Sequence, residues 1–105
     1  MPTPLEIEFH NAMVNIYERA KNEADYVATR FIQMVAQYGG VETAIKLINS
    51  DKPSEGYTAL WEKGRLDITV EALVQDTKWA PLFNTDEINK AQRRLKDYGY
   101  AVTDR

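Results

Sequence analysis

Apolar residues recur at steps of three and four from the start of the chain to Gly39, which is the spacing of one face of an α-helix. The members of this stripe are Phe9, Met13, Ile16, Ala20, Ala24, Val27, Phe31, Val35 and Tyr38. Thr3, Pro4 and Glu6 form a capping box with proline in the first turn, and Gly39–Gly40 forms a stop signal. Because neither glycine nor proline interrupts the stripe, the pattern predicts one continuous helix over residues 3–38.

The two halves of this predicted helix differ in how much of their surface is apolar. Residues 26–38 are apolar on almost every side, which is typical of a helix enclosed by neighbours. Residues 5–24 carry a narrower stripe, which is typical of a helix pair between subunits. The later helices of the same chain would cover such a stripe equally well, so both interpretations stay open.

The length of the predicted helix favours an assembly. At about 1.5 Å per residue it would extend about 50 Å, whereas a domain of this size has a diameter of about 33 Å. The helix must therefore bend, protrude or pack against another chain. We expect a homodimer that self-associates through Phe9, Met13, Ile16 and Ala20.

Shorter helices are predicted over residues 41–49, 57–63 and 85–98, with a turn-rich loop over residues 50–56. Asp67 or Thr69 is expected to cap a further short helix that ends at Leu73 or Val74, although the β-branched residues 68–70 also suit a short extended segment. Residues 79–83 form an apolar corner that is expected in the core, and Thr85 is the predicted cap of the last helix. The predicted fold is an all-α single domain spanning residues 1–105. Its long helix, residues 3–38, carries a cap of four or so short helices, residues 41–105, packed against its C-terminal half.

Composition excludes several kinds of site. The 105 residues contain no cysteine, which rules out disulfides, thiolate metal sites and cysteine nucleophiles. The single histidine, His10, lies one turn after Glu6, but a zinc site needs about three protein ligands. Glycine-rich phosphate loops and nucleophile motifs are absent from the sequence. We therefore expect a non-enzymatic protein with no metal and no cofactor.

The sequence also lacks the features of targeting and membrane segments. Its first residues do not follow the basic and apolar pattern of a signal peptide, and no apolar run approaches the roughly 20 residues of a membrane span. The expected location is the cytoplasm, away from membranes.

Charge is distributed unevenly along the chain. Residues 1–77 hold seven Lys/Arg and twelve Asp/Glu, a balance of -5, whereas residues 78–105 hold six and four, a balance of +2; together they give the net charge of -3. The final helix carries four basic residues, Lys90, Arg93, Arg94 and Lys96. They form the alternative hypothesis of a nucleic-acid-binding accessory protein that contacts phosphates. A solvated helix face explains the same cluster.

Residues 56–73 combine a tryptophan, two glycines and several charges. Trp61 and Arg65 belong to residue types enriched at binding hot spots, so they are the candidate partner-binding residues. A structural role is the alternative: Trp61 would anchor the short helix, and Arg65 would pair with Glu62 or Glu71. A further hypothesis is a ligand pocket lined by four aromatic residues, Tyr26, Tyr57, Trp61 and Trp79.

Several tracts together resemble a family of small bacterial and phage-borne helical proteins with no established activity. They are residues 26–31, 39–44 and 56–73, Leu82–Phe83, and residues 94–100. The resemblance covers nearly the whole chain, and it implies one self-contained domain in a mobile-element or defence setting. The leading hypothesis is a protein-interaction module that acts as an accessory or inhibitory factor on a protein partner.

Overall fold

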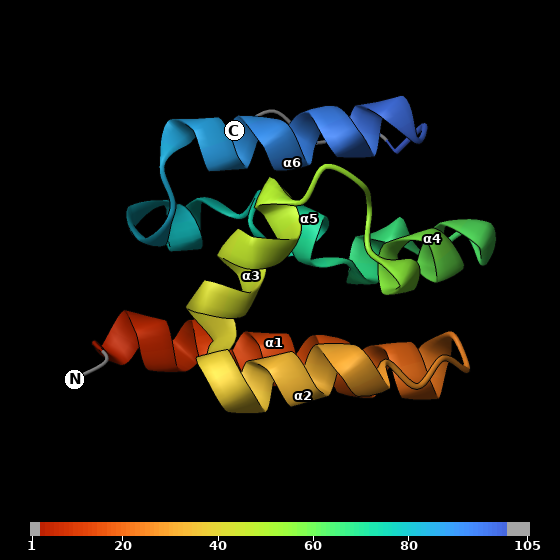
Figure 1. Ribbon diagram of the computed structural model, residues 1–105, viewed down its shortest axis with the longest axis horizontal. Helices are drawn as coiled ribbons and strands as arrows, with labels where there is room; N and C mark the ends of the chain where they lie inside the picture. The colour runs from red at the N-terminus through yellow and green to blue at the C-terminus, as the bar shows by residue number, and fades with distance from the viewer. Residues whose placement is uncertain (1–2, 101–105) are drawn as a thin grey trace.

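The computed structural model describes residues 3–100, and every regular element in that part of the chain is a helix (Figure 1). The α-helices are α1 (Pro4–Glu23), α2 (Thr29–Tyr38), α3 (Gly40–Asn49), α4 (Glu55–Glu62), α5 (Val70–Leu73) and α6 (Thr85–Asp97). Two short 3₁₀-helices, η1 (Leu66–Ile68) and η2 (Thr77–Leu82), flank α5. The predicted all-α fold is confirmed; the ends of the predicted domain, residues 1–2 and 101–105, lie outside the described residues.

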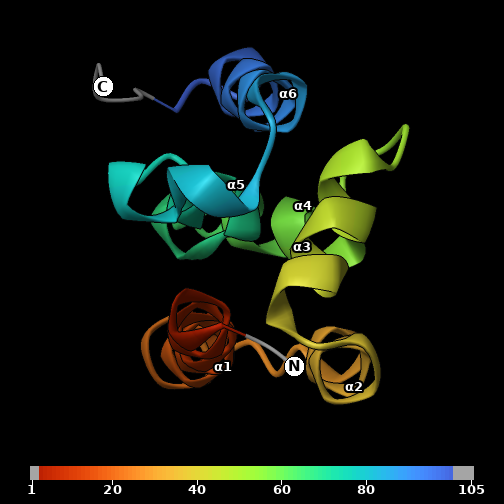
Figure 2. The ribbon, with the colours of Figure 1, turned by 90° about the vertical axis from the view of Figure 1, so that its left-hand side faces the viewer.

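The helices form three levels. Helices α1 and α2 lie side by side on one surface, and α6 lies on the opposite surface with its axis in nearly the same direction (Figures 1 and 2). Helix α3 rises from the end of α2 towards α6, while α4 and α5 occupy the level between the two surfaces. The resulting globule measures 37 × 28 × 23 Å.

The prediction of one helix over residues 3–38 is wrong, because the chain turns between α1 and α2. Asp25 adopts a left-handed backbone with φ 51°, a conformation that Asp tolerates better than most residues. The amide of Tyr26 then donates to the carbonyl of Ala20 at 2.9 Å, which closes the end of α1. This turn also removes the conflict between helix length and domain size, because α2 runs back along α1.

The stripe proposed for self-association lies in the core of a single chain. Phe9, Met13, Ile16 and Ala20 are all buried, and Phe9 and Met13 have no exposed surface. Of the two interpretations of this stripe, the structure therefore favours covering by the later helices. A second chain has no access to these side chains in the folded protein, so the proposed dimer contact through them is corrected.

Helices α1 and α3 meet at Gly40 and His10. A Cβ at Gly40 would lie 2.6 Å from the His10 Cα, so only glycine permits this approach. The Gly40 amide donates to His10 Nδ1 at 3.1 Å, which gives one free amide of the first turn of α3 a partner. His10 therefore stabilises the start of a helix.

Other predicted elements appear with small changes. Thr69 caps α5 by accepting from the amide of Ala72, and residues 68–70 form no strand. The cap of α6 is Asn84, one residue before the predicted Thr85, and Glu87 completes its capping box. Trp79 is buried in the core as predicted for the apolar corner.

Candidate functional site

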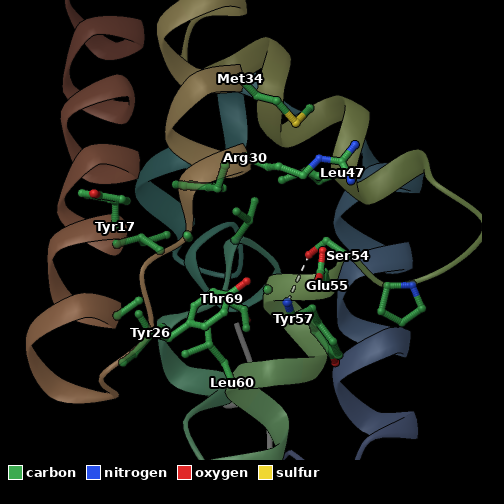
Figure 3. Close-up of a pocket in the computed structure, with 18 of the residues that line it drawn as sticks. Tyr17, Tyr26, Arg30, Met34, Leu47, Ser54, Glu55, Tyr57, Leu60 and Thr69 are labelled. Atoms are coloured by element: carbon green, nitrogen blue, oxygen red, sulfur yellow. Dashed lines mark hydrogen bonds between the residues drawn. The ribbon is translucent and has the colours of Figure 1, made fainter.

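An apolar groove with a volume of about 650 Å³ lies between α2, the end of α3, the loop that follows it, and α4 (Figure 3). Sites for small ligands usually have volumes of about 300–1,000 Å³. The α1–α2 turn closes one end of the groove, where the ring of Tyr26 packs against Gly56 of α4. Residues far apart in the sequence thus form a single concave surface.

Helix α2 supplies the most exposed apolar wall of the groove. Val27, just before the helix, is 54% exposed, and Phe31 and Met34 are half-buried. Val35 is the only fully buried residue of α2. The enclosure predicted for residues 26–38 is therefore wrong: α2 is covered on one side, while the narrower stripe of α1 forms the core.

A buried polar network lies under the groove. The Arg94 guanidinium donates to Glu71 Oε2 at 2.9 Å, to the Leu47 carbonyl at 3.2 Å and to the Ser50 carbonyl at 2.7 Å. The Tyr57 hydroxyl donates to the backbone carbonyl of Arg94 at 3.1 Å. The network thus joins α6 to the end of α3, to α4 and to α5.

Burial affects the titration of two groups in this network. Loss of hydration raises the pKa of Glu71 above its usual value, and the hydrogen bond from Arg94 opposes that rise. Loss of hydration also raises the pKa of Tyr57, with the nearby Glu71 carboxyl adding to the effect. Because both side chains are already bonded to their neighbours, they hold the fold together beneath the groove.

Positive charge predominates at the rim of the groove. Arg30, Lys46 and Lys52 contribute cations, and Glu55 contributes one carboxylate. The labelled Arg30 side chain runs from α2 towards α3 (Figure 3). Lys46 forms a long ion pair of 3.8 Å with Glu42, whereas Arg30 and Lys52 have no ion pair within residues 3–100.

The four basic residues of the last helix do not form one surface. Arg94 turns inward to Glu71, with a side chain that is only 12% exposed. Lys90 is exposed and bonds to Asn49 at 3.3 Å, and Arg93 and Lys96 are exposed. The inclusion of Arg94 in a phosphate-binding cluster is therefore corrected, because its donors serve the protein's own backbone and carboxylate.

Trp61 and Arg65 also have partners within the chain. The Trp61 indole donates to the carbonyl of Tyr98 at 3.1 Å and packs edge-to-face on its ring, yet the residue remains 45% exposed. Arg65 bonds to Asp67 at 3.0 Å and to Glu23 at 2.6 Å, and thus ties the end of α1 to η1. The expected pairing of Arg65 with Glu62 or Glu71 does not occur.

The ion cluster around Arg65 holds its acidic members in the charged form. Hydrogen bonds from Arg19 and Arg65 lower the pKa of Glu23 to about 2. Hydrogen bonding from Arg65 also lowers the pKa of Asp67. The ion pairs on this side of the molecule therefore link the end of α1 to η1.

Two of the four aromatic residues predicted for a pocket line the groove, Tyr26 and Tyr57. Trp79 lies in the core against Phe9, with ring centroids 5.2 Å apart, and Trp61 lies outside the groove. The sequence pattern did not predict the cations at the rim, Arg30, Lys46 and Lys52, as site residues. No sequence motif joins them, because they come together only where α2 packs against α3 and the loop that follows it.

Within residues 3–100, no group of three or more histidine, aspartate or glutamate side chains is arranged to hold a metal ion. In the same part of the chain, no helix is both long enough and apolar enough for a bilayer span.

No protein-family model, curated protein or solved structure matches this chain. The resemblance to small bacterial and phage-borne proteins therefore stays a prediction.

Proposed function

We propose that this protein is a non-enzymatic interaction module that receives apolar side chains of a partner protein in the groove. The observation that carries the proposal is the uncovered wall of α2 beside a concave surface of about 650 Å³. Exposed apolar surface next to such a concavity is typical of a binding site. In the mobile-element or defence setting implied by the resemblance, the module would act as an accessory or inhibitory factor.

The polar groups under the groove support binding over catalysis. Glu71 pairs with Arg94, Tyr57 donates to the Arg94 carbonyl, and Thr69 donates to the Leu66 carbonyl at 2.6 Å. A general acid or base must reach the atom that exchanges the proton. Each of these side chains is already hydrogen-bonded to another group of the protein, so their arrangement suits a structural role beneath the groove.

Two matched substitutions test the surface. Val27 and Ile7 are both large exposed apolar residues, at 54% and 49%, but only Val27 lines the groove. Tagged wild-type protein is used to purify a partner from the native host, and the purified partner is then titrated by calorimetry. We expect Val27→Glu to weaken binding at least tenfold and Ile7→Glu to leave it within twofold, with both variants folded by circular dichroism.

Equal effects of the two substitutions would place the binding surface elsewhere. Failure of the wild-type protein to bind any purified host protein would overturn the proposed function. Light scattering on the wild type distinguishes a second copy of the chain from a different partner. If the groove binds a second copy, Val27→Glu converts a dimer to a monomer.

A further inference from the structure

Three apolar residues border the groove on the side of α2. Phe31 and Met34 are three positions apart on α2, and Val27 lies in the turn just before the helix. Apolar residues three apart lie on the same helix face, which suits packing against a second helix. Met34 adds a flexible side chain that adapts to its neighbour.

The backbone of the occupant must satisfy its own hydrogen bonds. Within residues 3–100 the structure contains no strand, so the groove offers no sheet edge to an extended segment. Buried amide and carbonyl groups without partners cost free energy. A helix meets this requirement by itself, and helix-in-groove binding is an established mode of peptide recognition.

The charges at the rim indicate the chemistry of the occupant. Two lining residues already have an ion-pair partner outside the groove, Lys46 with Glu42 and Glu71 with Arg94. The remaining charges, Arg30 and Lys52 against Glu55, give a local balance of +1, although the chain as a whole carries -3. A partner with carboxylates beside its apolar stripe would therefore be favoured over a neutral or basic partner.

We propose that the groove binds an amphipathic helix of a partner protein that carries carboxylates along the flank of its apolar face. This inference rests on the proposed function and specifies the partner. The apolar stripe would pack on Val27, Phe31 and Met34, while the acidic flank would face Arg30 and Lys52. The acidic flank also disfavours basic helices that share the same apolar pattern.

Four synthetic peptides of about 16 residues test the inference. Three share a leucine stripe at helical spacing and carry glutamate, glutamine or lysine on the flank; the fourth has the glutamate flank with the leucines replaced by serine. Each is titrated into the isotope-labelled full chain, and amide shifts are followed by NMR. We expect the glutamate peptide to shift residues around Met34 and to bind about tenfold tighter than the glutamine peptide. The lysine peptide should bind more weakly than both, and the serine peptide should not bind.

Charge reversal on the protein supplies the matched control. Arg30→Glu with Lys52→Glu should remove the preference for the glutamate peptide and leave the affinity of the glutamine peptide within about threefold. Arg93→Glu with Lys96→Glu reverses two exposed cations on α6, outside the groove, and should leave the preference intact. Raising salt from about 0.05 M to about 0.5 M should also reduce the preference, because these charges face solvent.

The possible failures separate the two proposals. Equal affinity for the glutamate and glutamine peptides, with shifts in the groove, would overturn the acidic helix and leave the proposed function standing. Binding of the glutamate peptide at the α6 surface instead would also overturn the inference. If no peptide shifts groove residues at millimolar concentration, both proposals fail. Saturation of the groove by dodecanoate in that case would identify a small amphiphile as the occupant.

Discussion

Helices α2 and α6 have similar amphipathic patterns but very different surroundings. Helix α6 begins with an Asn84–Glu87 capping box, buries Ala91 and Leu95, and sends Arg94 into the polar network. Helix α2 has no side-chain cap at its first residue and buries only Val35. Other parts of the same chain cover the apolar face of α6, whereas one side of α2 borders an open groove.

The difference shows which structural information an amphipathic sequence pattern carries and which it lacks. An apolar face indicates that burial against some surface is favourable, because apolar area leaves water. It does not specify whether that surface belongs to the same chain. In α6 the surface comes from α3 and α5, whereas in α2 we propose that part of it comes from a partner.

Removing the anchor of α6 should have the largest effect on stability. Arg94→Ala leaves the Glu71 carboxylate buried without its partner and the carbonyls of Leu47 and Ser50 without their donor. Breaking a buried ion pair in this way costs about 3–5 kcal/mol. Urea denaturation should show this loss, while Arg93→Ala on the exposed side of α6 should change stability by about 0.5 kcal/mol or less.

The pH dependence of the Arg94→Ala variant provides its control. Without Arg94, the main opposition to the effect of burial is lost, and the pKa of Glu71 rises further. A carboxyl whose pKa is higher in the folded state stabilises the fold below its unfolded pKa, and that stability is lost as pH rises. The deficit of the variant should therefore be smaller at pH 5 than at pH 8. A deficit that does not depend on pH would show that Glu71 is hydrated in the variant.

Truncation of apolar side chains should separate the two helices directly. Leu95 is fully buried on α6, so Leu95→Ala should cost about 2–5 kcal/mol through lost burial and a cavity. Met34 is half-buried on α2, and Met34→Ala should cost about 1 kcal/mol or less. Urea denaturation of both variants measures the difference. Similar losses would mean that the groove side of α2 belongs to the core and is not a free surface.

The sequence predicts the helices of this protein better than their arrangement. The periodicity of residues 85–98 and Thr69, one of the two caps predicted for α5, correspond to observed elements. Local propensity and capping are encoded within a few residues, which is why they can be predicted. The turn at Asp25 was not predicted, since it depends on a left-handed aspartate and on a bond from Tyr26 back to Ala20. Because this turn reverses the direction of the chain, it changes where every later residue lies relative to α1.

The site was less predictable than the helices. Lys52 lies in a loop and Arg30 on a helix, and only the packing of α2 against α3 places both at one groove. Glu71 and Arg94 are 23 positions apart, and neither sequence position indicates that the pair is buried. Charged residues are usually solvated, so the sequence pattern predicts Arg94 at the surface.

The smallest expected effect concerns the ends of the two helices. Asn84→Ala removes the capping box of α6 and should cost about 1 kcal/mol, which corresponds to a fall in Tm of about 4–8 °C for a domain of this size. Ala28→Asp places an acceptor and a negative charge at the uncapped start of α2, so it should raise Tm by a few degrees, a gain of about 0.5 kcal/mol. Thermal unfolding followed by circular dichroism measures both. If Ala28→Asp lowers Tm, the weak coverage of α2 does not extend to its first turn, and the contrast with α6 lies only in the apolar faces.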